Sequence, residues 1–377
     1  MTRRLATTSL TGDHDDLQRT VRRFLADKSP EAEVRRLMET ESGYDESVWQ
    51  QMAQQLGLQA LIIPEQYGGS GFGYVELALV LEEMGRVLLC APYFSTVVLA
   101  ASLLLALEDE QANASYLPGI ASGETIATVA VVESAGRWDL DELTLRAVPT
   151  GTSWNLTGTK DFVIDGVLAG LVLVVTRTSG GMSVFAVERG AVGFTSEAMT
   201  TMDQTRKLAR LTFSATPATL VGAEGQGLAA VSQMLDLAAV SLAAEQVGGL
   251  QRVLDMAVDY ARLREQFGRP IGSFQAIKHK CADMLVEVES ARSTAYQAAH
   301  AADTDRAALP VLAGLAKAYC SDAYFHGAAQ NVQIHGGIGF TWEHPAHLYL
   351  KRAKSSELLF GDADYHRELL AQRLGVA

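Results

Sequence analysis

The chain has 377 residues, of which 48% are hydrophobic and 20% are charged, and its formal net charge is −13. This length allows two or three structural domains with large cores, and the composition is ordinary for a globular enzyme. The acidic balance argues against a nucleic-acid partner, because no basic cluster is concentrated enough to neutralise a phosphate backbone. An anionic ligand would therefore need cations placed locally.

The N-terminal segment and the cysteines argue against export and membrane insertion. The first ten residues, MTRRLATTSL, hold a basic pair but no sustained apolar core, and no apolar run of spanning length is free of charge. The three cysteines, Cys90, Cys281 and Cys320, are far apart and odd in number. Reduced thiols fit this pattern better than a disulfide framework or a metal site. We therefore expect a cytoplasmic protein with no membrane association.

Helical periodicity dominates the first third of the chain. Apolar residues repeat at intervals of three and four from about Asp13 to Leu117, as at Leu17, Val21 and Leu25. The glycine-dense segment 63–73 interrupts this pattern, and the simplest interpretation is a turn between helices. We expect an N-terminal α domain over residues 1–122.

The pattern changes after Gly119. Short runs rich in Val, Thr and Phe are separated by clusters of Gly, Ser and Asp, which predicts strands joined by turns. These spacings indicate an all-β domain over residues 123–224, either a sandwich or a barrel. The predicted strands are Thr125–Glu133, Leu143–Pro149, Ser153–Thr157, Asp161–Ile164, Leu171–Thr176, Ser183–Val187 and Arg210–Phe213.

The helical period returns at Gly225 and holds to the end of the chain. Four long segments, at about 226–263, 274–301, 307–334 and 343–374, predict an antiparallel four-helix bundle over residues 225–377. The whole chain is therefore expected to belong to the α+β class. Its order would be an N-terminal helical domain, a middle β-sandwich or barrel domain and a C-terminal four-helix bundle.

The turn between the first two bundle helices carries an unusual set of polar and aromatic residues. In the segment 260–275, YARLREQFGRPIGSFQ, glycine and proline residues break the helical pattern. A guanidinium pairs bidentately with phosphate oxygens, so this set suits a dianion that carries a stacked ring. The other interpretation is a polar corner of a helical bundle. The residues concerned are Arg264, Gln266, Phe267 and Gln275.

Two motifs, in this order and spacing, resemble the acyl-CoA dehydrogenase family. REQFGRPIGSFQ matches the family's R-x-x-F-G-x-x-x-x-x-x-Q, and QIHGGIGF, about sixty residues further on, matches Q-x-x-G-G-x-G-F. The run Ile63–Arg86 is also similar to the family, so the resemblance covers nearly the whole chain. It implies an FAD cofactor between the β domain and the C-terminal bundle, an acyl-CoA substrate, and an electron-transfer flavoprotein as acceptor.

The resemblance also assigns a cofactor-binding role to the residues that match the two motifs. In the family these groups reach across a subunit interface to a neighbour's FAD, which implies a homo- or heterotetramer. Glycine at such a place lets the backbone approach the cofactor closely. The matched residues are Arg264, Gln266, Phe267 and Gln275 in the first motif, and Gln333, Gly336 and Gly337 in the second.

The flavin side of the implied site departs from the family's pattern. The family's Y-x-x-T-E-x-x-x-G-S-D loop reads VAVVESAGRWD at residues 129–139, which puts Val132 at the hydroxyl position. The family's W-I-T/S-N reads FVID, so Phe162 can stack on a ring but Ile164 offers no hydroxyl. Each lost hydroxyl removes a contact worth about 0.5–1.5 kcal/mol. We expect these three residues to form a weak flavin site.

The family's catalytic glutamate is also replaced. Phe360 stands at the usual position, and the alternative position on the first bundle helix falls at Ala238 and Ala239. Glu245 follows Ala238 by seven residues, so it shares that helix face within about 20°. Its neighbours are small and apolar, which would raise the pKa of a carboxyl and suit a base. Glu245 is therefore the candidate catalytic base, and the alternative is a structural glutamate paired with Arg or Lys.

Two functions follow from these departures. The first is an FAD-dependent acyl-CoA dehydrogenase that uses Glu245, alone or as one subunit of an α2β2 complex. The second is a catalytically silent subunit that completes the FAD site of a partner chain. Heteromeric family members of actinobacteria, some acting on steroid-derived CoA esters, are similar in having one degenerate subunit. A flavin oxidase or monooxygenase on the same fold is a further alternative.

The Glu343–His347 cluster lacks other ligands at sensible spacing, so no metal site is expected.

Overall fold

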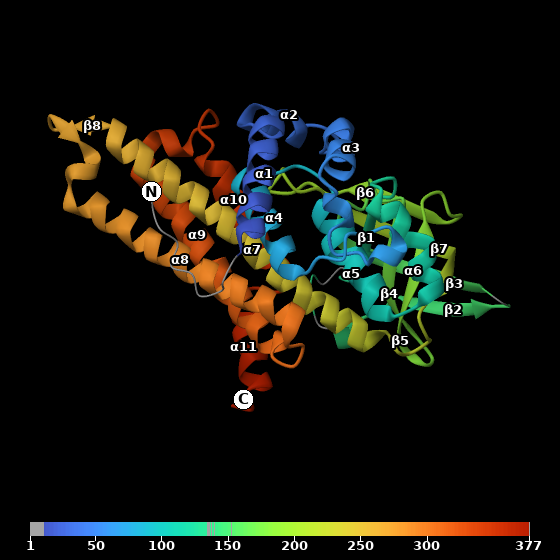
Figure 1. Ribbon diagram of the computed structural model, residues 1–377. Coiled ribbons are helices and arrows are strands. Elements are labelled where there is room, and N and C mark those ends of the chain that lie inside the picture. Colours follow the sequence, from blue (N-terminus) through green and yellow to red (C-terminus); the bar gives the residue numbers. More distant parts are fainter. Residues whose placement is uncertain (1–10, 134–135, 137, 139, 152, 377) are drawn as a thin grey trace. The chain divides into compact units, whose positions relative to one another are not determined.

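The computed structural model describes residues 11–133, 136, 138, 140–151 and 153–376. The first ten residues, whose sequence argued against a signal peptide, lie outside this range. The described chain divides into two compact units. The first unit draws on Met1–Arg35, Tyr74–Leu89 and Ala239–Ala377, and the second on Arg36–Gly73 and Cys90–Ala238. Along the chain, helices come first, strands follow and helices return, as the sequence predicts (Figure 1).

The first unit is built almost entirely of helices. Met284, Val288, Ala291 and Ala295 form a fully buried stripe along α8, because residues spaced by three and four share one face of a helix. Helices α2 (Glu31–Met38) and α7 (Gly227–Leu263) contribute residues to both units. The other helices of the first unit are α1 (Gly12–Lys28), α4 (Tyr74–Arg86), α8 (Gln275–Thr304), α9 (Leu309–His335), α10 (Ala346–Leu358) and α11 (Ala363–Arg373).

Helices α4 and α7 approach each other closely through glycines. A Cβ atom added to Gly248 would lie 1.8 Å from the backbone oxygen of Glu82, and one added to Gly85 would lie 1.9 Å from that of Glu245. Backbone atoms cannot move aside as a flexible side chain can, so this crossing requires glycine on both helices.

Among the described helices, α7 is long and apolar enough to cross a membrane, but 72% of its most apolar 18-residue window is buried. It is built as a core helix.

The prediction of one helix over 343–374 is wrong. The segment forms two helices, α10 and α11, which are separated by a turn at 359–362. In this turn Phe360 and Gly361 have φ angles of 61° and 94°, which no α-helix accommodates. The carboxylate of Asp362 then accepts a hydrogen bond from the backbone N–H of Tyr365 at 2.8 Å and caps α11.

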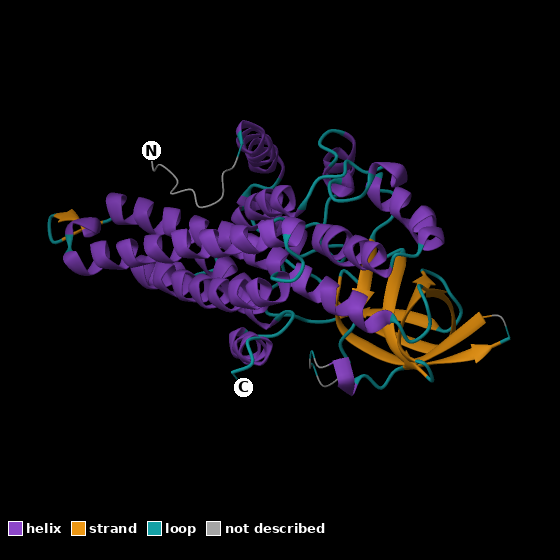
Figure 2. Ribbon diagram, turned by 60° about the horizontal axis from the view of Figure 1, so that its bottom comes forward, coloured by secondary structure: helices purple, strands orange, loops and turns teal. Residues whose placement is uncertain are grey.

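The second unit contains the β-sheet that Figure 2 shows in orange. Its strand order is β1-β4-β2-β3-β7-β5, β6 pairs with β7, and a further pairing of β4 with β5 closes the ring into a barrel. Leu156, Val172, Phe185 and Leu211 lie in its core with 0% exposure. The strands are β1 (Ala127–Ala130), β2 (Arg146–Thr150), β3 (Ser153–Ile164), β4 (Leu171–Thr178), β5 (Gly181–Glu188), β6 (Phe194–Ala198) and β7 (Leu208–Val221).

Two details of the strand prediction are wrong. Ser153–Thr157 and Asp161–Ile164 are parts of one strand, β3, whose register shifts at Leu156/Gly158 and at Lys160/Val163. The glycine between them marks an irregularity inside the strand and not its end. Strand β6 was not predicted, because its sequence, FTSEA, is short and largely polar. The helices of this unit include α3 (Glu46–Gln54), the π-helix η3 (Phe94–Ala101), α5 (Ser102–Leu107) and α6 (Glu110–Ala121).

Candidate functional site

A small exposed hairpin follows the end of α7. Strand β8 (Glu265–Gln266) pairs with β9 (Arg269–Pro270), and the two residues between them, Phe267 and Gly268, have φ angles of 56° and 74°. Positive φ at both central residues is the geometry of a tight hairpin turn. This turn presents the ring of Phe267, which is 91% exposed.

The other predicted residues of the first motif are also on the surface. Arg264 and Gln275 are exposed, and the side-chain amide of Gln266 donates a hydrogen bond to the carbonyl of Glu265 at 2.8 Å. The ring of Phe274 meets Phe267 edge-on at 6.0 Å. The hairpin is therefore a surface feature that offers a cation, an amide and an aromatic ring to an external group.

The structure brings the two motifs together at one end of the helical unit. The rings of Tyr260, on α7, and His335, at the end of α9, stack with their centroids 4.3 Å apart. Nδ1 of His335 donates a hydrogen bond to the carbonyl of Asn331 at 2.8 Å, and burial lowers the pKa of this histidine. A neutral ring can stack and donate in this way, so His335 connects the two motifs.

Two glycines of the second motif, Gly336 and Gly337, meet no packing demand from the described residues, whereas Gly339 is packed against His335 and Val332. Gly336 ends α9 with a φ angle of 62°, which favours glycine, and a Cβ atom on it or on Gly337 would meet nothing within 4 Å. Both glycines and Gln333 are exposed. This open backbone fits close approach by a diphosphate, as the family resemblance implies for FAD.

The β unit offers less to a flavin. The side chains of Val132 and Ile164 are each only 3% exposed, so both serve the core of the unit. The carbonyl of Ile164 accepts a hydrogen bond from the hydroxyl of Thr128 at 2.6 Å. Phe162, with a φ angle of 56°, keeps 39% of its surface exposed. Four residues of the departing loop, Ser134, Ala135, Arg137 and Asp139, lie outside the described residues.

A buried ion pair fixes the chain beside that loop. Nζ of Lys160, which has 0% exposure, donates to the carbonyl of Val131 at 2.8 Å and to Glu133 at 3.0 Å. Burial lowers the pKa of Lys160 to about 8. Burial alone would raise the pKa of Glu133, but hydrogen bonds from Thr144 and Leu145 and the charge of Lys160 lower it to about 2. Lys160 stands between Thr159 and Asp161 in β3, so its burial could not be predicted from its neighbours in the sequence.

Glu245 is part of another buried ion pair. Nη1 of Arg352, on α10, donates to Oε1 of Glu245 at 2.8 Å, and the two side chains are 4% and 7% exposed. The small residues around Glu245 serve close packing, since a Cβ atom on Gly249 would lie 2.4 Å from the ring of Tyr324. This geometry is that of a structural glutamate paired within the bundle. A catalytic role for Glu245 stays a prediction.

The turn that carries Phe360 is held from inside the bundle. Phe360 is 5% exposed, and its carbonyl accepts a hydrogen bond from Nε2 of His366 at 2.9 Å. Nζ of the fully buried Lys317 donates to the carbonyls of Glu357 and Gly361, both at 2.9 Å. Burial lowers the pKa of Lys317 to about 7. Burial and the nearby charge of Lys317 together lower the pKa of His366 to about 4. The turn is therefore held by side chains that donate hydrogen bonds to its main-chain carbonyls. Phe360 occupies the position where the family usually carries its catalytic glutamate, so the turn offers no carboxylate there.

The chain matches known proteins along most of its length. The family model "Acyl-CoA dehydrogenase, N-terminal domain" covers residues 11–124, and "Acyl-CoA dehydrogenase, C-terminal domain" covers residues 225–375. Acyl-CoA dehydrogenase IpdE2 of Mycobacterium tuberculosis is 36% identical over 343 residues, which are 91% of either protein.

Solved structures share the fold. A chain of the ChsE4-ChsE5 complex from Mycobacterium tuberculosis has a TM-score of 0.89 at 30% identity and covers 98% of this chain and 99% of its own. A steroid ACAD has a TM-score of 0.88 at 31% identity, with 96% of this chain and 98% of that chain covered.

These matches define the class of protein as an oxidoreductase that acts on the CH–CH group of acyl-CoA thioesters. The chain belongs to the acyl-CoA dehydrogenase family, whose members are flavoproteins. The predictions of the fold class, the family and the class of reaction are confirmed.

Proposed function

We propose that this chain is one subunit of a heteromeric, FAD-dependent acyl-CoA dehydrogenase and contributes to a flavin site that a partner chain completes. The observation that carries the proposal is the ion pair between Glu245 and Arg352. It engages Glu245, the carboxylate that the sequence offers in place of the missing base, while the exposed groups of the two motifs are kept.

The groups proposed to face the partner fit a dinucleotide. Arg264 supplies a permanent cation for phosphate oxygens, and Gln333 supplies an amide. Gly336 and Gly337 leave the backbone open to close approach, because no atom of the described residues lies within 4 Å of a Cβ placed on either. FAD, when bound, supplies the acceptor for the hydride that leaves the substrate's β-carbon.

The groups proposed to be lost are those that would act on substrate and flavin within this chain. If Glu245 took up a proton, it would lose the charge on which its pair with Arg352 depends, and breaking a buried pair costs about 3–5 kcal/mol. Val132 and Ile164 bring no hydroxyl group, and both side chains are buried. A partner that carries the glutamate and the hydroxyls would complement this chain.

We further propose the class of substrate and the electron acceptor. Two of the similar structures are a steroid ACAD and the two-protein complex ChsE4-ChsE5, which favours a bulky, ring-derived CoA ester and a mixed tetramer here. Electrons would leave through an electron-transfer flavoprotein, as the family implies. The three free cysteines are compatible with the reducing cytoplasm as the place of action.

The proposal can be tested on the complex with the proposed partner, a second dehydrogenase-like chain to be sought in the neighbouring reading frames. Arg264→Gln is expected to lower the FAD retained by the co-purified complex, because the diphosphate loses its cation. Arg262→Gln is the matched control, since Arg262 is another exposed arginine two residues away. FAD is measured by absorbance after gel filtration. Equal retention in the two variants would contradict the proposal.

The second candidate is a self-sufficient dehydrogenase that uses Glu245. The observation in its favour is the deep burial of this carboxylate, which is 5% exposed, on the helix face shared with the family's alternative base position. This function predicts that Glu245→Gln abolishes turnover of the isolated chain. Our proposal predicts that the isolated chain has no turnover to abolish, and that the variant changes the stability of the fold.

A further inference from the structure

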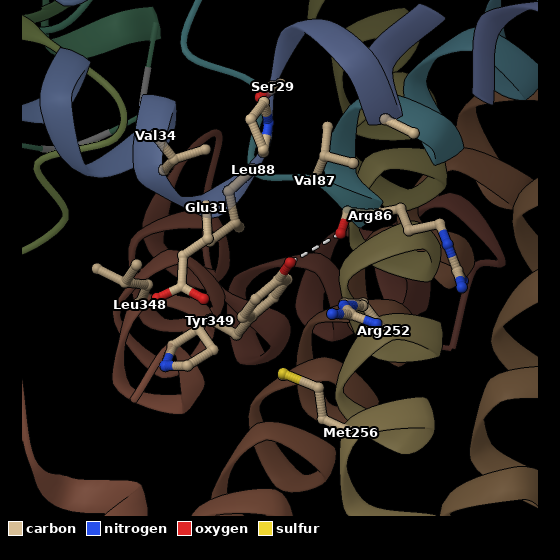
Figure 3. Close-up of a pocket in the computed structure, with 13 residues that line it drawn as sticks. Ser29, Glu31, Val34, Arg86, Val87, Leu88, Arg252, Met256, Leu348 and Tyr349 are labelled. Atoms are coloured by element: carbon tan, nitrogen blue, oxygen red, sulfur yellow. Dashed lines mark hydrogen bonds between the residues drawn. The ribbon is translucent and has the colours of Figure 1, made fainter. Parts of the chain in front are cut away.

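The helical unit contains a cavity that none of the predicted site residues lines. Its volume is about 240 Å³, and its walls come from the end of α1, the start of α2, the end of α4, the middle of α7 and the start of α10. Figure 3 shows this space with Arg252 and Tyr349 side by side and Met256 below them. We call it the Arg252 cavity.

Its walls carry one cation that has no ionic partner in the described part of the chain. Arg86 pairs with Asp255 at 2.6 Å, and its guanidinium points away from the cavity (Figure 3). Glu31 accepts from Arg35 at 2.8 Å. For the half-buried Arg252, the described residues provide no carboxylate within ion-pair distance. The cavity therefore offers a positive charge to an occupant.

The hydroxyl of Tyr349 lies beside this cation. It donates a hydrogen bond to the carbonyl of Arg86 at 2.8 Å, and its oxygen accepts from Arg252. Burial raises the pKa of Tyr349 to about 12, so the group remains a neutral phenol. The phenol orients the guanidinium without neutralising it, which leaves the charge of Arg252 available.

Apart from Ser29 and from Glu31, whose carboxylate is paired with Arg35, the remaining walls are mostly apolar. Val34, Leu88, Met256 and Leu348 line the cavity and are between 2% and 8% exposed. An occupant with a hydrocarbon body would bury its surface against these side chains, and each Å² removed from water is favourable. The volume is below the roughly 300–1,000 Å³ of cavities that hold drug-sized ligands, so the occupant must be small.

We propose that the Arg252 cavity binds a short-chain carboxylic acid, with its carboxylate on Arg252 and its hydrocarbon chain against Met256 and Leu348. A carboxylate satisfies a guanidinium through two parallel hydrogen bonds, and no covalent step is involved. None of the residues proposed to bind FAD, and not the candidate base Glu245, lines this cavity. An acid bound here joins α4, α7 and α10, so it stabilises the folded state in proportion to its occupancy.

The test is a calorimetric titration of the full-length chain with sodium hexanoate and, separately, with hexanamide. The two probes share a body and differ in charge, so hexanoate is expected to bind at least about tenfold more tightly because a hydrogen bond between charged groups is the stronger kind. Equal affinity for acid and amide, or no binding of hexanoate up to millimolar concentration, would overturn the proposal.

Variants locate the site. Arg252→Gln is expected to weaken hexanoate binding by about 10- to 100-fold, whereas Arg262→Gln, on the exposed end of the same helix, leaves it unchanged. Val87→Phe fills part of the cavity from a half-buried position and keeps the cation, so it should also block binding. This variant decides the question if Arg252→Gln does not fold. Unchanged affinity in Val87→Phe would place the acid elsewhere and contradict the assignment.

Discussion

The two parts of the predicted cofactor site differ in what they offer to an external group. At one end of the helical unit, Arg264 and Gly337 are exposed, and a Cβ atom on Gly337 would meet no described atom within 4 Å. In the β unit, Val132 and Ile164 stand at positions where the family carries hydroxyl groups, and their side chains are 3% exposed. Exposed residues of this kind are free to meet a group outside the chain. Residues drawn into a core serve the fold.

Two carboxylates fall on the buried side of this contrast. Glu245 is buried with Arg352 inside the helical unit, and Glu133 is held by Lys160 and two main-chain N–H groups in the β unit. Both ion pairs support the folded state. Neither leaves a carboxylate facing open space, as a base that must reach a substrate would require.

The largest expected change in the free energy of unfolding comes from breaking the ion pair between Glu245 and Arg352. Arg352→Ala leaves a buried carboxylate without its guanidinium and should lower the free energy of unfolding by about 3–5 kcal/mol. Urea denaturation followed by circular dichroism measures this. The double variant Glu245→Leu with Arg352→Met should recover most of the loss, because apolar residues of similar size can replace a buried pair. A loss below about 1 kcal/mol in Arg352→Ala would show that the pair is not structural.

A smaller effect is expected from Glu133→Gln. The pKa of Glu133 is lowered from its ordinary 4.5 to about 2, so its ionised form stabilises the folded state above pH 4.5, and this contribution is lost as the pH falls towards 2. The variant should be less stable than the original by about 1–2 kcal/mol at pH 7. This difference in stability should narrow as the pH falls below 4.5 and close below about pH 2. Unfolding curves over this pH range check this, and a difference that does not change with pH would contradict the assignment.

The smallest effect on stability is expected from Gly337→Ala. Its Cβ atom would meet nothing within 4 Å and the residue has no positive φ angle, so the free energy of unfolding should change by less than about 0.5 kcal/mol. If the open backbone receives a diphosphate, the same methyl group should reduce the FAD retained by the complex. Gly248→Ala is the contrasting variant, because its Cβ would lie 1.8 Å from a backbone oxygen and must destabilise the fold. If Gly337→Ala lost stability but kept its FAD, Gly337 would be needed for packing and not for the approach of a diphosphate.

The sequence predicted the succession of helices, strands and helices because apolar periodicity is local. It also predicted that two distant motifs share a function, and the contact between Tyr260 and His335 shows them side by side. The break at Phe360 was missed because a positive φ angle at phenylalanine depends on what holds the turn, here Lys317 and His366. His366 is six residues from Phe360, but Lys317 is 44 residues from Gly361, and local periodicity does not register that contact.

The environment of Glu245 could not be predicted for a similar reason. Its small neighbours indicated a cavity, yet small residues also allow helices to pack closely, and sequence alone does not separate the two. The deciding partner, Arg352, lies 107 residues away. Likewise, the strand β6 was hidden by its polar sequence, since its pairing with β7 depends on main-chain hydrogen bonds that any residue can make.

The flavin content of the purified chain tests the central claim most directly. The chain is produced alone and together with the proposed dehydrogenase-like partner. The number of FAD molecules per polypeptide is measured by flavin absorbance and protein mass. We predict a colourless lone chain and a yellow complex with about one FAD for every two chains. A lone chain that is yellow, with one FAD per polypeptide and full dehydrogenase turnover, would contradict the account.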